Sequence, residues 1–217
     1  MVRAMNTPDA WTAAVATVAL LAGYELLLLL VERWRPRALA RSAHVGLRLD
    51  WFRAASRQPG SELMAVQLLR NAVMAATLSA STAALALVAA STLAAPSLRV
   101  FNDGLTAATL TPRLLLEAVL LVQLFASLLC SVMAVRYYNH AGFIAAMPVG
   151  SAERLAWEPV GAGYLRRAGL LYSWGLRQLP MVAPTVVAVL HAPLGPGAAL
   201  AVIGLLLVLD RFGGARG

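Results

Sequence analysis

The sequence contains no lysine, so all 18 of its basic residues are arginines. Its single cysteine, Cys130, excludes an intramolecular disulfide and any metal site built from several cysteines. Charged residues are scarce as well, at 13% of the chain, whereas a soluble domain usually carries about 25%. These absences argue against an ordinary soluble domain and against a disulfide framework.

Short catalytic signatures are also missing. The sequence has no glycine-rich phosphate loop, no HExxH zinc motif and no GxSxG nucleophile elbow. His140 lies beside Asn139, and a histidine there could bind a metal or relay protons, but a lone histidine at a helix end is more often a cap or a surface residue. Since no nucleophile–base pair and no metal set is visible, we expect no enzyme, no cofactor and no metal.

Long apolar runs dominate what is present, and hydrophobic residues make up 60% of the chain. A helix of about 20 apolar residues crosses the hydrocarbon core of a bilayer. Five runs approach this length: 11–31, 64–93, 114–135, 168–190 and 192–209. The last run is marginal in length. The sequence therefore predicts an all-α integral membrane helical bundle with four or five transmembrane helices, in one domain over residues 1–217.

The arginines indicate how this bundle is oriented. Seven lie in the first loop, 33–63, four in or beside the connection 141–167, and two in the tail, against three on the opposite side. Cytoplasmic loops carry an excess of arginine and lysine. We therefore expect a multi-pass protein of the cell inner membrane with its N-terminus outside and its C-terminus in the cytoplasm. Most of the net charge of +8 follows from this topology, so no nucleic acid is expected as a partner.

The first loop has an amphipathic, arginine-rich section from His44 to Phe52. Such a section can lie along the membrane surface. An ordinary positive-inside loop explains it equally well, so both interpretations stay open.

Two motifs carry a family resemblance. Residues 67–82 read QLLRNAVMAATLSAST, and residues 135–143 read VRYYNHAGF. Together they resemble an uncharacterised membrane-protein family, domain of unknown function 599, found in bacteria and plants. The resemblance covers about residues 20–209 and implies a multi-pass membrane fold without implying a reaction. The family's arginine–asparagine pair and its polar tract match Arg70, Asn71, Arg136, Asn139 and His140.

Polar residues inside or beside the spans are the candidate site. Ionisable side chains in a span usually face the bundle interior and pair there. We expect Glu25 to be the counter-ion of Arg70 or Arg177 in a polar cavity open to the cytoplasm, and a merely structural ion pair is the equal alternative. The cavity candidates are Glu25, Gln67, Arg70, Asn71, Gln123, Arg136, Asn139, His140 and Arg177.

Two functional classes follow. A hydrated polar cavity would favour a small transporter or channel-like carrier. Sealed polar groups beside uncovered apolar or basic surfaces would favour a non-catalytic membrane subunit or scaffold. The lipid bilayer is the expected environment in both cases, with a homo-oligomer or partner membrane proteins as possible associates.

Overall fold

The computed structural model describes residues 8–34, 40–102 and 110–210, and all regular secondary structure within these ranges is helical. The elements are α1 (Pro8–Trp34), α2 (Ala40–Ala55), α3 (Glu62–Asn102), α4 (Pro112–Ala146), α5 (Ala152–Leu190), the short 3-10 helix η3 (Ala192–Leu194) and α6 (Gly195–Asp210). The predicted all-α bundle is confirmed. Arg3, Arg35, Arg37, Arg211 and Arg216, which entered the arginine count, lie outside the described residues.

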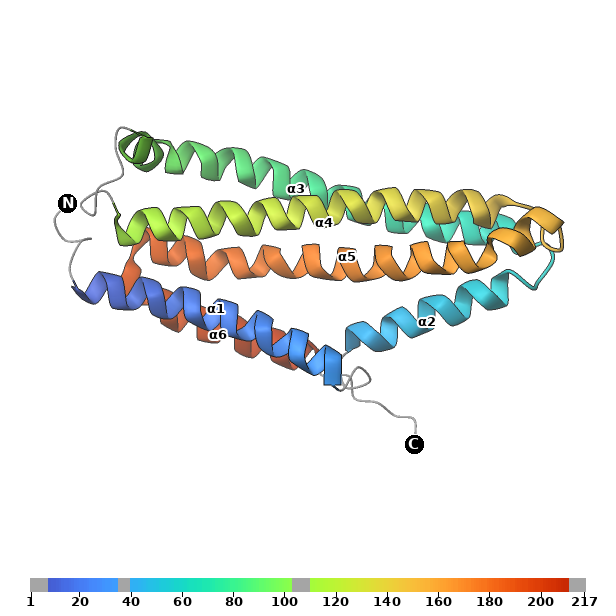
Figure 1. The fold of residues 1–217 in the computed structure, drawn as a ribbon, viewed down its shortest axis with the longest axis horizontal. Helices are drawn as coiled ribbons and strands as arrows, with labels where there is room; N and C mark the ends of the chain where they lie inside the picture. Colours follow the sequence, from blue (N-terminus) through green and yellow to red (C-terminus); the bar gives the residue numbers. More distant parts are fainter. Residues whose placement is uncertain (1–7, 35–39, 103–109, 211–217) are drawn as a thin grey trace.

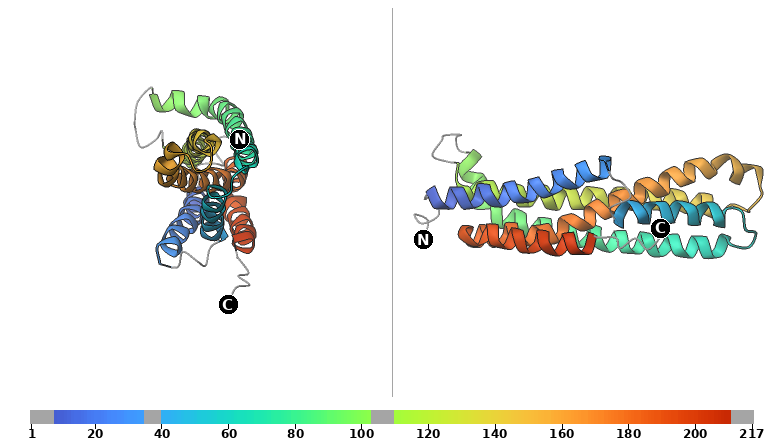
Figure 2. Two further views of the ribbon diagram at one scale, coloured as in Figure 1. Left: turned by 90° about the vertical axis from the view of Figure 1, so that its right-hand side faces the viewer. Right: turned by 90° about the horizontal axis from the view of Figure 1, so that it is seen from below.

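Three long antiparallel helices, α3, α4 and α5, form the body of the molecule, with α4 packed along both of the others (Figure 1). The remaining helices cover different parts of this body. Helices α1 and α6 lie together against one half, and α2 lies against α5 along the other half (Figure 2). We call these parts the α1/α6 half and the α2 half.

The buried side chains follow the same division. One apolar cluster in the α2 half joins Phe52 of α2 to residues of α3, α4 and α5, including Leu69, Tyr138 and Leu165. Three further clusters lie in the α1/α6 half and contain no residue of α2. The molecule thus has two successive cores that share α3, α4 and α5.

Four of the described helices are long and apolar enough to cross a membrane: α1, residues Glu62–Arg99 of α3, α4, and Ala192–Leu209. The fourth expected span, 168–190, is the second part of α5. Helix α5 is not among the four helices that are long and apolar enough to cross a membrane. The expected spans 64–93 and 114–135 lie inside longer helices. At about 1.5 Å per residue, α3 with 41 residues is roughly 60 Å long, about twice the hydrocarbon core.

The amphipathic section of the first loop lies in helix α2. Val45 and Phe52 are buried, and α2 runs beside α5 roughly along the bundle. A helix that lies in the membrane plane would instead run across the long axis of a membrane-spanning bundle. The section is therefore a helix packed on α5, which corresponds neither to a helix lying along the membrane surface nor to a loop without secondary structure.

The second hydrophilic connection, 141–167, is almost entirely helical. Helix α4 continues to Ala146, and α5 begins at Ala152. Gly150, with φ of 89°, supplies the left-handed residue that this tight turn needs, and the Ser151 hydroxyl caps α5 by accepting from the Arg154 amide. Pro159 lies inside α5 and does not interrupt it.

Small residues set the close helix contacts. Ala76, Ser79 and Ala83 are buried on the face of α3 that packs on α4, where small residues let two helices approach closely. At Gly195 a Cβ would lie 2.4 Å from the Thr17 hydroxyl and 2.6 Å from the Ala188 methyl. Glycine is therefore required where the start of α6 meets both α1 and α5.

Candidate functional site

A carboxylate and an amide meet in the middle of the α1/α6 half. Gln178 Nε2 of α5 donates a hydrogen bond to Glu25 Oε1 of α1. Gln178 is buried and Glu25 is half-buried. Because an unsatisfied polar group costs several kcal/mol in an apolar environment, this contact stabilises the packing of α1 on α5.

Two more hydrogen bonds continue this polar seam between α4 and α5. The Thr185 hydroxyl donates to Gln123 Oε1 at 2.9 Å, and the Ser127 hydroxyl donates to the Gly175 carbonyl at 2.8 Å. Gly175 lies in the helical turn before Pro180, where a proline weakens the backbone hydrogen-bond pattern. Side chains of α4 therefore satisfy polar groups of the proline-containing helix.

A groove of about 320 Å³ adjoins this seam. Glu25, Gln123 and Gln178 contribute its polar groups, and apolar residues of α1 and α4 such as Leu21 and Val122 form its walls. Two of the expected cavity residues, Glu25 and Gln123, are thus brought to one groove. Arg177 is also buried, at 8% exposure, beside Gln178 in the sequence of α5.

Arg70 does not join this groove. It is exposed, and within the described chain it forms no ion pair with Glu25. The reason is the face by which α3 packs: Leu69 and Ala76 are turned to α4, so Gln67, Arg70 and Asn71 lie on the outer face. The expectation that Glu25 is the counter-ion of Arg70 is therefore wrong.

The tract after the third expected span also lies outside the groove. Arg136, Asn139 and His140 are exposed on α4. The His140 ring lies 5.4 Å from the ring of Tyr164, and the described residues contain no group of three or more His, Cys, Asp or Glu side chains that could hold a metal ion. These three residues line the α2 half, so a single cavity that includes all nine candidates does not form.

The register of the helices gives the level of these residues along the bundle. Glu25 meets Gln178, and α1 and α5 are antiparallel, so Trp34 at the end of α1 is level with Gly169 of α5. Gly175 of α5 faces Ser131 of α4. Because α4 and α5 are antiparallel, six residues away along each helix Gly169 lies level with about Tyr137. Arginines gather within about one or two helical turns of this level, among them Arg33, Arg48, Arg70, Arg136, Arg166 and Arg167. We call them the arginine belt.

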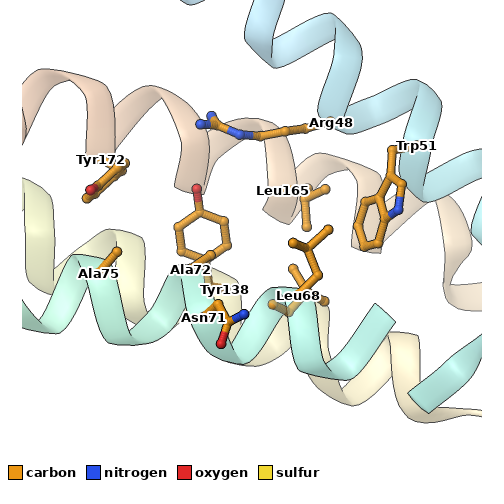
Figure 3. A pocket seen from close by; sticks show the side chains of 10 residues that line it. Arg48, Trp51, Leu68, Asn71, Ala72, Ala75, Tyr138, Leu165 and Tyr172 are labelled. Atoms are coloured by element: carbon orange, nitrogen blue, oxygen red, sulfur yellow. The ribbon is translucent and has the colours of Figure 1, made fainter. Parts of the chain in front are cut away.

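A second pocket, of about 360 Å³, lies at the arginine belt between α2, α3, α4 and α5. Arg48 reaches over it from α2, and the Tyr138 hydroxyl is directed toward Arg48, with Tyr172 to one side (Figure 3). Asn71, one of the expected cavity residues, also contributes to this pocket. Trp51, Leu68 and Leu165 are among its apolar residues.

Arg154 is a buried arginine that joins three elements at the far end of the α2 half. Its Nη1 lies 2.7, 2.6 and 3.0 Å from the carbonyl oxygens of Ile144, Ala145 and Met147, and its Nη2 donates to the Ser56 hydroxyl at 3.1 Å. Burial lowers the pKa of Arg154, and the charges of Glu62 and Glu158 act in the opposite direction. A cation on the last carbonyls of α4 also complements the helix dipole.

Arg113 and Glu117 form an ion pair at the start of α4. Arg113 Nε donates to Glu117 Oε1 at 2.7 Å, one turn apart at the start of α4, and Glu117 is buried at 1% exposure. Sequence reasoning missed the other two arginines. Arg154 was counted as a loop residue and Arg48 as part of a polar loop, because neither helix was expected there.

The helices and the polar seam define a multi-pass helical membrane protein. A family model, "Protein of unknown function, DUF599", matches residues 12–215, and the chain belongs to that family. This confirms the resemblance carried by residues 67–82 and 135–143. The searches of curated proteins and of solved structures found no match.

Proposed function

We propose that the chain is a non-catalytic membrane subunit with five spans, which projects the α2 half into the cytoplasm and binds a partner protein there. The α1/α6 half would occupy the bilayer of the inner membrane. The N-terminus would then be outside, and α6 would end at the cytoplasmic surface. The arginine belt supports this placement, because arginine is enriched where spans leave the membrane on the cytoplasmic side.

The length of α5 supports a projection beyond the membrane. Ala152, where α5 begins, is 17 residues before Gly169 at the level of the arginine belt. At about 1.5 Å per residue this part of α5 is roughly 25 Å long. The far end of the α2 half would therefore lie in water, well beyond the head groups.

Large apolar side chains are exposed at this far end, and they are the main observation that supports the proposal. Phe143 of α4 is 72% exposed, Leu155 of α5 60% and Met64 of α3 65%. Lipid would cover comparable side chains in the α1/α6 half, whereas here none of the described residues covers them. Exposed apolar surface on a part of a protein outside the membrane is typical of a protein–protein contact.

The polar seam agrees with a subunit. Glu25, Gln123 and Ser127 each take part in a hydrogen bond to α5. Polar groups that are hydrogen-bonded between helices, together with uncovered apolar and basic surface, are what a subunit requires. The partner would be another membrane-associated protein or a second copy of this chain.

Site-specific photocrosslinking tests the proposal. A benzoylphenylalanine in place of Phe143 should give a discrete protein adduct in native membranes, and the mass of that adduct distinguishes a second copy from another protein. Phe125 is the matched control, an exposed phenylalanine on the same helix in the α1/α6 half. Its probe should react with lipid. Protein adducts at neither Phe143 nor Leu155 would contradict the proposal.

A carrier is the second candidate, and the groove beside Glu25 is the observation that favours it. A carboxylate within a span is a common element of proton relays. In liposomes with an imposed membrane potential, a proton-coupled carrier should take up protons in a way that Glu25→Gln abolishes. Equal uptake by the parent protein and Glu25→Gln would remove this candidate.

A further inference from the structure

The pocket under Arg48 has a cation at one end without a neighbouring anion. Arg48 is half-buried, and among the side chains that the structure describes it forms no ion pair with a carboxylate. The exposed arginine of the same helix, Arg53, is paired with Asp50 at 3.6 Å. Arg48 therefore brings an unneutralised positive charge into a hollow of the protein.

Two features fix the guanidinium over the pocket. Gly169 of α5 leaves room for it: a Cβ at this position would lie 2.4 Å from Arg48 Nη1. The Tyr138 hydroxyl points toward this guanidinium, and Tyr172 lies to one side of the same pocket (Figure 3). A guanidinium and hydroxyl donors at one place are the groups that bind a carboxylate or a phosphate.

The rest of the pocket is apolar. Trp51 of α2, Leu68 and Ala72 of α3 and Leu165 of α5 line the part beyond the guanidinium (Figure 3). At about 360 Å³ the hollow has the size of a small-ligand site, which is usually an apolar cleft with a few polar groups that orient the ligand. An inorganic anion would leave most of this lining uncovered.

We propose that this pocket binds an anionic amphiphile. Its carboxylate or phosphate head is held by Arg48 with the hydroxyls of Tyr138 and Tyr172, and its apolar body lies between α2 and α3. The head group can belong to a membrane lipid or to a free fatty acid, because both present an oxyanion on an apolar chain. The inference does not depend on a partner protein at the far end of the α2 half.

Direct binding to the full-length protein in a neutral maltoside detergent tests the proposal. Dodecanoate and dioctanoyl-phosphatidylglycerol are titrated separately by equilibrium dialysis. We expect one of them to bind at one molecule per chain, and the one that binds identifies the source of the head group. Arg48→Gln should weaken this binding at least tenfold, and Tyr138→Phe should weaken it severalfold.

Three controls keep the result interpretable. Arg53→Gln removes an exposed arginine of the same helix and should bind like the parent protein. Dodecanol, which has no charge, should bind at least tenfold more weakly than dodecanoate. Should Arg48→Gln fail to fold, Ala75→Trp fills the pocket from an exposed position of α3 and should abolish binding.

Three results would overturn the proposal. The first is that neither anionic probe binds, and the second is that dodecanol binds as tightly as dodecanoate. The third is that folded Arg48→Gln and Ala75→Trp proteins both bind like the parent.

Discussion

Arg154 stabilises the far end of the α2 half more than any exposed arginine can. Its guanidinium lies on three carbonyl oxygens at the end of α4 and on Ser56 after α2, and its carbon atoms approach the ring of Phe52, with Cζ 5.8 Å from the centroid. One side chain thus connects α2, α4 and α5. Removal would leave buried carbonyl groups without donors.

Arg154→Ala should lower the free energy of unfolding by about 3 kcal/mol, because each hydrogen bond to a charged group contributes about 1.5–3 kcal/mol. The measurement is thermal unfolding of the purified protein in detergent. Arg57→Ala, at an exposed arginine nearby, should change the unfolding temperature little. An equal effect of both substitutions would contradict the assigned role.

Glu25 gives a second prediction at this scale. Glu25→Ala removes the acceptor of the Gln178 amide and should destabilise the protein by about 1–2 kcal/mol. Glu25→Gln keeps an acceptor oxygen and should stay close to the parent in thermal unfolding. A large loss with Glu25→Gln would mean that the charge itself, and not the hydrogen bond, stabilises the packing of α1 on α5.

The polar side chains also show which contacts can be predicted from the sequence and which cannot. The pairing of Arg113 with Glu117 was predictable, because both lie on one helix one turn apart. The meeting of Glu25 with Gln178 was not, since it depends on how α1 packs on α5 across a sequence separation of 153. Arg70 was misplaced because its position in the sequence does not tell which face of α3 packs on α4.

At the scale of the helices, α3, α4 and α5 are longer than a bilayer requires. The expected apolar runs lie inside these helices, but hydropathy placed the ends of α4 and α5 where the arginine-rich connection begins. That connection continues the same helices, because Tyr138, Ala141 and Leu165 extend the packed core past the apolar runs. Local composition therefore predicted loops where tertiary packing maintains helix.

Gly195→Ala tests the close approach of α6. Its Cβ would meet Thr17 and Ala188 within 2.6 Å, and backbone of α5 lies nearby, so α6 would have to move away from α1 and α5. We expect the unfolding temperature in detergent to fall clearly. Gly197→Ala is the matched control, since a Cβ at Gly197 meets nothing within 4 Å. A fall of the same size in the control would show that helix spacing is not the cause.

For the whole molecule, the two successive cores imply two environments. The α1/α6 half carries the polar seam, with its groups bonded between helices, as expected inside lipid. The α2 half carries the arginine belt, the buried Arg154 and exposed apolar side chains at its far end. A membrane protein with this division would hold α1 and α6 in the bilayer and present the α2 half to the cytoplasm.

The most direct test of that division is cysteine accessibility, which the single native Cys130 makes simple. In a Cys130→Ala background, single cysteines replace Met64, Leu155, Leu85 and Phe125, all exposed in the structure. A membrane-impermeant maleimide should label the cysteines at positions 64 and 155 in inside-out vesicles, and not in right-side-out vesicles. Those at positions 85 and 125 should stay unlabelled in both. Labelling at 85 and 125, or protection of 64 and 155 in inside-out vesicles, would contradict the account.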